Sequence, residues 1–262
     1  MRQPQSIAWR RLVVTLSLAC LCPLGCASRP KPDIHTARHA FFAGDLVTAT
    51  QTLDTLIATD RRWERPARLD RAITLMAAGN VDEAEVQLRS LRDELDHAGG
   101  GIPVDEALSM LRDDRSREFE CAPHEHVMIR TLLCLCSLAG DGSDAESYAI
   151  QAAMKQAAVR RDAEEQQQQW LGSTLEATTH QELAFTPYVR GVLKEATHHD
   201  YDDASRNYAL VSAISPHFAS AKIDQQRVTS GTHSRANHGV IYVFALVGCG
   251  RCIDRDELWA TS

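Results

Sequence analysis

The sequence lacks features that several classes of protein require. Basic residues are outnumbered, with 28 Lys and Arg against 35 Asp and Glu in 262 residues, so the net charge is −7. Such an acidic chain is a poor nucleic-acid binder, because the neutralisation of phosphates requires a basic face. Aromatic residues make up only 6% of the chain, which argues against an extended base-stacking surface. Eight cysteines are too few for a disulfide-dense scaffold.

Motifs of the common enzyme classes are missing as well. No G-x-S-x-G, P-loop or dinucleotide-binding glycine run occurs. The triplet His124-Glu125-His126 lacks the i,i+4 spacing that places two imidazoles on one helical face for a metal. We therefore predict no catalytic residues, no metal site, no cofactor and no small-molecule substrate, and we expect a protein that is not an enzyme.

The apolar segment at the N-terminus is too short to span a membrane. Residues 12–25 follow Arg10 and Arg11 and number 14, whereas a spanning helix needs about 20 apolar residues. A charged start, a short apolar centre and small residues after it are typical of a secretory signal. We predict a signal peptide over residues 1–25. Without it, 25 basic residues face 35 acidic ones, and the net charge becomes −10.

The end of this segment, Leu24-Gly25-Cys26-Ala27-Ser28, resembles a bacterial lipobox, although Pro23 stands where leucine is usual. The resemblance implies a lipid on Cys26 and a lipoprotein-type signal. Residues 26–35 then form a tether, whose two prolines suppress helix. In lipoproteins of two-membrane bacteria, Ala27 rather than Asp after the cysteine implies the outer membrane, with the body facing the periplasm. An ordinary signal peptide, with cysteines as apolar filler, is the alternative.

A short motif recurs along the rest of the chain. Ala-Gly-(Asp/Asn) ends an apolar helical segment, and an alanine follows five residues after the glycine: Gly44 with Ala49, Gly79 with Ala84, and Gly140 with Ala145. A fourth copy has His199 in the place of the glycine, followed by Ala204, Tyr208, Val211 and Pro216. Glycine permits the left-handed conformation that ends a helix, Asp or Asn caps the next helix, and the alanine lets two antiparallel helices approach closely.

This motif resembles the tetratricopeptide-repeat (TPR) family, whose repeat unit has about 34 residues. Gly44 and Gly79 are 35 residues apart, whereas the later spacings are 61 and 59, which leaves room for an extra helical pair or an insertion. The resemblance implies a mainly α protein with a TPR-like α-helical repeat solenoid over residues 36–220, whose hollow face binds a protein or peptide. Unrelated helical hairpins with a common turn are the alternative.

The first repeat contains candidate contacts for such a partner. Arg38, Phe41 and Phe42 fall at positions that face the hollow side in TPR proteins. We expect one phenylalanine to pack in the core and the other to be a possible contact.

A closer resemblance, to uncharacterised bacterial lipoproteins with TPR units, covers roughly residues 36–255. Its landmarks are Leu111-Arg-Asp-Asp114, then Phe119-Glu-Cys-Ala-Pro-His-Glu125, and the closing segment Gly239–Gly248. The family offers no established reaction to carry over.

The C-terminal part, residues 221–262, is expected to combine a loop with one strand. Residues 221–238 are polar, and Val240–Val247 is an apolar run rich in β-branched and aromatic residues, which predicts a buried strand. A lone strand must pair with something. The partner could be Ile253–Trp259, another strand of the chain, or another protein through strand addition.

Two cysteines follow this run directly, as Cys249-Gly-Arg-Cys252. A CxxC after a strand is found in thioredoxin-like redox proteins, but only ten residues follow Cys252, too few to complete that fold. We favour a local disulfide or two free thiols. Cys134 and Cys136 lie in an apolar helical segment and are expected to fill the core, while Cys121 could pair with another cysteine.

Together these patterns predict a membrane-anchored, exported lipoprotein that acts as a protein–protein interaction scaffold in the cell envelope. Its expected partners are another protein or peptide and, through the lipid, the membrane; no nucleic acid is expected. The alternative is a thiol-disulfide redox protein or sensor that uses Cys249 and Cys252.

Overall fold

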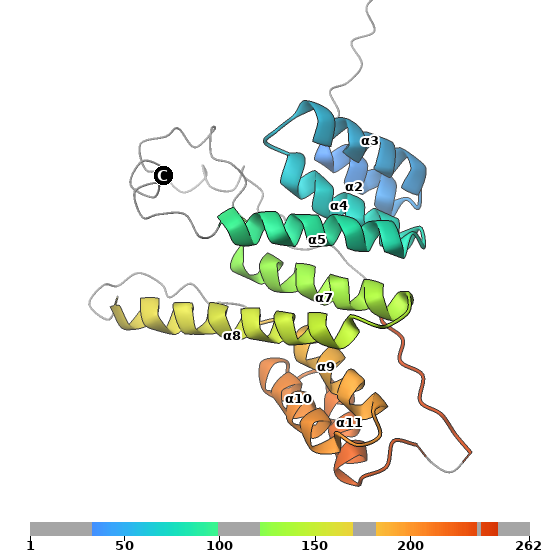
Figure 1. Ribbon diagram of the computed structural model, residues 1–262, viewed down its shortest axis with the longest axis vertical. Coiled ribbons are helices and arrows are strands. Elements are labelled where there is room, and N and C mark those ends of the chain that lie inside the picture. The colour runs from blue at the N-terminus through green and yellow to red at the C-terminus, as the bar shows by residue number, and fades with distance from the viewer. Residues whose placement is uncertain (1–32, 99–120, 170–181, 235–236, 246–262) are drawn as a thin grey trace, which may run out of the picture. The chain divides into compact units, whose positions relative to one another are not determined.

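The computed structural model describes residues 33–98, 121–169, 182–234 and 237–245. Within these ranges every regular element is an α-helix (Figure 1). The fold is therefore mainly α, as the sequence predicts. Contacts divide the chain into two compact units, Met1–Asp70 and Arg71–Ser262.

Several predicted features lie outside the described ranges. These are the signal peptide, Cys26 and most of the tether, the landmark Leu111–Asp114, and the pair Cys249 and Cys252.

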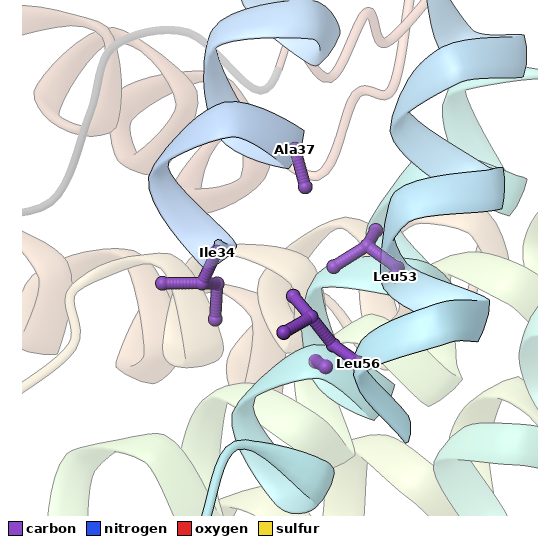
Figure 2. Close-up of a cluster of buried hydrophobic side chains, with 5 residues drawn as sticks. Ile34, Ala37, Leu53 and Leu56 are labelled. Carbon is purple, nitrogen blue, oxygen red and sulfur yellow. The ribbon is translucent and has the colours of Figure 1, made fainter. Parts of the chain in front are cut away.

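The first unit is built on a helical hairpin. Helix α2 (Ile34–Phe42) packs against α3 (Leu46–Thr59), and α4 (Glu64–Ala77) begins in this unit. Its core consists of small and aliphatic side chains, and Figure 2 shows how those of Ile34, Ala37, Leu53 and Leu56 converge. Ala67 of α4 belongs to the same cluster. Trp63 and Ile57 pack against this cluster from its edge.

In the second unit, the described residues form the rest of α4 and six further helices. They are α5 (Val81–Ala98), α7 (Pro123–Ala139), α8 (Ala145–Gln169), α9 (Phe185–Ala196), α10 (Tyr201–Ile214) and α11 (Ala219–Thr229). Contacts run mainly between helices that are neighbours in the described chain: α5 with α7, α7 with α8, α8 with α9, α9 with α10, and α10 with α11. Among these helices, none combines the length and apolar content that a membrane-spanning helix needs.

Helix α7 is the central helix of this unit, because α5, α8 and α9 all contact it. Its residues 129–137 are buried without interruption. Six of these nine residues are apolar, and the other three, Arg130, Thr131 and Ser137, are polar or charged. Thr131 donates its hydroxyl to the carbonyl oxygen of Val127 (3.0 Å), and its oxygen also lies 2.9 Å from the hydroxyl of Thr186 on α9.

The C-terminal part differs from the prediction in two ways. The polar residues 221–238, expected to form a loop, are helical as far as Thr229, because α11 buries Ala221 and Val228. The predicted C-terminal strand is not formed in the described residues. Residues 240–245 form no regular element and pair with no strand among the described residues, and Leu246 and Val247 lie outside the described ranges. The alternation typical of a strand is nevertheless present, because Ile241 and Val243 are 87% and 82% exposed while Tyr242 and Phe244 are partly buried. The two aromatic side chains pack against helices α9–α11 rather than against a sheet.

Candidate functional site

The repeat-motif alanines are all buried. Ala49, Ala84 and Ala204 are fully buried, and Ala145 is 2% exposed. Each alanine stands in the first turn of its helix or at its first residue, where a larger side chain would separate the two helices of the hairpin.

The first two turns of the motif share one geometry. Gly44 and Gly79 both have φ +81, in the left-handed region. The Gly44 N–H donates to the carbonyl oxygen of Phe41 (3.0 Å), and the Asp45 N–H donates to that of Ala40 (2.9 Å). The second turn repeats these bonds, from Gly79 to Met76 at 3.1 Å and from Asn80 to Leu75 at 2.9 Å. This paired bonding satisfies the carbonyl groups at the end of the first helix.

The third and fourth turns use other residues. Gly140 has φ −92, and the left-handed position is Gly142, whose N–H donates to the carbonyl oxygen of Ser137 (2.8 Å). In the fourth turn the left-handed residue is His198 (φ 59), one position before His199. The Thr197 hydroxyl oxygen accepts the backbone N–H groups of His199 (3.2 Å) and Asp200 (3.1 Å), and these bonds hold a non-glycine residue in this conformation.

Pro216, the last motif residue, lies in an exposed turn two residues after α10 ends. A proline cannot continue a helix without losing a hydrogen bond, so this place suits it.

The candidate contacts of the first repeat differ in exposure. Phe42 is 56% exposed, whereas Phe41 is partly buried, and their rings meet edge to face at 5.4 Å. Arg38 forms an ion pair with Asp70 of α4, with Nε and Oδ2 2.7 Å apart. Arg38 is thus engaged within its own unit, and Phe42 is the exposed member of the three.

Three described cysteines carry free thiols. Cys121, Cys134 and Cys136 are all buried, and their burial raises the pKa of each thiol to about 12. A thiol with such a pKa is a poor nucleophile at neutral pH, because the thiolate is the reactive form.

The most densely connected polar group is Glu195, in the last turn of α9. Its side chain is fully buried. Arg227 of α11 donates Nε to Oε1 and Nη2 to Oε2, each at 2.7 Å. The hydroxyls of Tyr208 (2.8 Å) and Tyr242 (2.7 Å) donate to Oε2, and His233 Nδ1 lies 3.0 Å from Oε1. One carboxylate therefore joins the helices α9, α10 and α11 to His233 and Tyr242, which follow α11 in the chain.

Electrostatics favour the ionised form of Glu195. Burial by itself raises its pKa, but the hydrogen bonds from Arg227, Tyr242 and Tyr208 outweigh that effect and bring the pKa below its ordinary value. The pKa of Arg227 is raised, chiefly by its hydrogen bonds to Glu195. Burial is the first cause that raises the pKa of Tyr208 and of Tyr242, and the hydrogen bond to Glu195 adds to it.

Residues 237–245, called the C-terminal segment below, lie against this site. Tyr242 reaches Glu195 and also accepts a hydrogen bond from Arg227 Nη2 (3.0 Å). The Phe244 ring meets those of Phe185 and Tyr188 edge to face, at 5.7 and 6.4 Å. Tyr188 in turn donates its hydroxyl to Asp224 Oδ2 (2.9 Å).

This arrangement suits binding better than acid–base chemistry. Both oxygens of Glu195 already accept at least two hydrogen bonds, so the carboxylate has no free position for a substrate proton. The part of the chain that the structure describes contains no cluster of three or more His, Cys, Asp or Glu side chains able to hold a metal. What the site does is hold an extended segment against three helices.

Sequence reasoning did not identify Glu195 or its partners as a site. The one available signal was the alternation of Tyr242 and Phe244 with Ile241 and Val243, which predicts two unlike faces of an extended chain. No known protein-family model, curated protein or solved structure matches this chain.

Proposed function

We propose that this protein is an exported, lipid-anchored lipoprotein whose TPR-like helical body binds another protein or a peptide in the cell envelope. Binding, rather than turnover, is its activity in this proposal. The lipid would be attached at Cys26, and the body would face the periplasm from the outer membrane.

The observation that carries the proposal is the recurrence of one hairpin geometry. The turns at Gly44 and Gly79 share their dihedral angle and both of their hydrogen bonds, and each is followed by a fully buried alanine. In the second unit, packing is mainly between successive helices. Helices that pack in chain order are typical of repeat proteins, whose extended surfaces bind peptides and proteins.

Exposed apolar side chains on the helices supply candidate contact points. Phe42 on α2 is 56% exposed, and Met154 on α8 is 67% exposed with Ile150 one turn before it. Single exposed apolar residues are common on protein surfaces, so their use in binding has to be tested position by position.

Site-specific photo-crosslinking tests the binding role. A photoreactive residue replaces Phe42 or Met154 in the full chain, and matched controls place it at the exposed polar positions Gln51 of α3 and Asp162 of α8. We expect a defined adduct from at least one apolar position and none from the controls. The absence of adducts at every position in intact cells would refute the scaffold role.

Metabolic labelling with a fatty acid tests the anchor, with Cys26→Ser as its control. The proposal expects label and membrane association in the wild type and loss of both in the variant. A wild-type protein that stays unlabelled and soluble would contradict the anchor.

The same adducts separate the scaffold from the redox alternative. Replacement of both Cys249 and Cys252 with serine should leave the crosslinked adduct unchanged if binding is the function. Loss of the adduct in a folded double variant would favour the redox protein instead.

A further inference from the structure

The surface that carries the C-terminal segment is a defined place on helices α9–α11. We call it the α9–α11 platform, and it consists of Phe185, Tyr188, Glu195, Tyr208 and Arg227. Two parts of the platform have distinct chemistry. The Phe185 and Tyr188 rings receive an aromatic ring, while Glu195 and Arg227 bind a phenolic hydroxyl.

We propose that the α9–α11 platform is a binding site for an extended, uncharged peptide segment with the pattern Tyr-x-Phe, supplied by a partner protein, and that the chain's own C-terminal segment is its resident occupant. The proposal deepens the proposed function by naming the kind of partner, and it rests on that function only for the existence of the partner. The site itself can be tested without one.

The pattern follows from geometry. Side chains two residues apart lie on the same face of an extended chain, and Tyr242 and Phe244 both face the platform. The Tyr242 hydroxyl donates to Glu195 Oε2 (2.7 Å) and accepts from Arg227 Nη2 (3.0 Å), which requires a phenol at this position. The Phe244 ring lies within 5.7 Å of the Phe185 ring, and aromatic pairs at such separations prefer this edge-to-face arrangement.

The chemistry of the platform also explains why the peptide that it binds should be uncharged. Residues 239–245 contain no charged side chain. The two charged residues of the platform, Glu195 and Arg227, already pair with each other, and Arg227 also pairs with Asp224 of α11 at 2.7 Å. A charged side chain placed between the aromatic rings would lose its hydration without gaining a partner.

The occupant is held by few contacts. Among the described residues, no backbone hydrogen bond joins residues 239–245 to the helices. Ile241 and Val243 point away and are 87% and 82% exposed. A segment that is attached to the described helices mainly by two aromatic side chains, without backbone hydrogen bonds to them, belongs to the least stable parts of a fold and can exchange with a competitor.

Tethering explains why the segment nevertheless occupies the site. Tyr242 follows the end of α11 by only 13 residues. A short linker gives a tethered ligand an effective concentration of about 1 mM. A free peptide of equal intrinsic affinity must exceed this concentration to displace it, so a partner needs additional contacts elsewhere on the protein.

The test uses a fluorescent synthetic peptide of residues 237–245, with two lysines added for solubility, and the full chain. The double variant Tyr242→Ala/Phe244→Ala vacates the platform. We expect the peptide to bind this variant about tenfold more tightly than the wild type, if the effective concentration is about 1 mM and the intrinsic dissociation constant is about 0.1 mM. A peptide with alanine at both aromatic positions should bind neither protein.

Further variants show where the peptide binds and keep the test decisive. In the vacated variant, the additional change Phe185→Ala should weaken peptide binding, because it removes a ring that meets Phe244 and leaves Glu195 intact. Circular dichroism verifies the helices. Should the double variant unfold, the single variant Phe244→Ala retains the Tyr242 hydrogen bonds and should still bind the peptide more tightly than the wild type does.

Two results would overturn the proposal. Equal peptide affinity of the folded vacated variant and the wild type would show that the segment does not block a peptide site. A wild-type dimer in sedimentation that the double variant abolishes would assign the platform to the segment of a second copy. Peptide binding to the vacated variant without any envelope crosslink would retain the site and reject only the scaffold function.

Discussion

Replacement of Glu195 with glutamine is the perturbation to which the second unit should respond most clearly. Glutamine keeps the shape of the side chain but turns one oxygen into an NH₂ donor. In the wild type both oxygens accept hydrogen bonds, from Arg227 Nε and Nη2 at 2.7 Å and from the Tyr208 and Tyr242 hydroxyls. The new amide therefore directs a donor at other donors, and it removes the negative charge next to Arg227.

The size of the effect follows from burial. Removing one partner from a fully buried ion pair costs about 3–5 kcal/mol. Glu195 is fully buried, but the Arg227 side chain is 24% exposed and keeps Asp224 as a second partner at 2.7 Å. We therefore expect Glu195→Gln to lower the free energy of unfolding by about 2–4 kcal/mol at pH 7.

The pH dependence has a definite sign. Because the folded pKa of Glu195 lies below its ordinary value, the carboxylate stabilises the fold above the unfolded pKa of about 4.3. This contribution is lost as the pH falls through the lowered folded pKa. The wild-type protein should therefore lose its advantage over Glu195→Gln in that acidic range.

Urea unfolding followed by circular dichroism measures both effects. Asp202→Asn on α10 is the matched control, since Asp202 is exposed and its change should leave the unfolding midpoint nearly unaltered. Equal stability of Glu195→Gln and the wild type at pH 7 would refute the reasoning. So would a difference in stability that stays constant as the pH is lowered through the acidic range.

Three further predictions test other parts of the fold. Gly79→Ala should lower the free energy of unfolding by about 1–2 kcal/mol, because φ is +81 there; no atom lies within 4 Å of the added Cβ, so the cost comes from the backbone alone. Gly79→Asn should lower it less in the same urea experiment, and the reverse order would contradict the backbone explanation. Gly191→Ala places its Cβ 2.7 Å from the Tyr208 ring. The cost of this crowding, about 1–3 kcal/mol, should exceed the gain of about 1 kcal/mol in helix propensity, so the variant should be less stable, and a raised thermal midpoint would disprove this. Cys134 and Cys136, whose thiol pKa values are raised to about 12, should resist iodoacetamide at pH 8 until the protein unfolds; rapid modification of the native protein, detected by mass spectrometry, would show that they are accessible.

Local chemistry explains which parts of the fold the sequence predicts. Glycine followed by Asp or Asn encodes its turn within a few residues, and the turns at Gly44 and Gly79 adopt the expected left-handed conformation. The turn after α7 contains two glycines, so sequence cannot decide between Gly140 and Gly142. The left-handed His198 depends on the hydrogen bonds that the Thr197 hydroxyl accepts from the backbone of His199 and Asp200, a local arrangement that residue preferences do not reveal.

Contacts between distant residues explain what the sequence leaves open. The partners of Glu195 lie between 13 and 47 residues away, and nothing in the residue types indicates that they meet. Likewise, the alternation in residues 240–245 predicts an extended chain with two faces but not the surface that one face contacts. That surface proves to be helical, because Tyr242 and Phe244 find aromatic and polar partners on α9 and α11.

The alternation of exposed and partly buried side chains in the C-terminal segment also bears on its proposed displacement by a partner. An uncharged, β-branched and aromatic segment without a partner strand is prone to pair with other chains. Docking covers only one of its faces: Ile241 and Val243 stay exposed, and the backbone of residues 239–245 forms no backbone hydrogen bond with the described helices. A partner that displaced this segment with its own Tyr-x-Phe side chains, and made no other contact with it, would leave the segment exposed to water. A partner that takes the platform and also pairs with the freed segment would satisfy both surfaces, and we therefore expect displacement to favour a partner with an extended edge of its own.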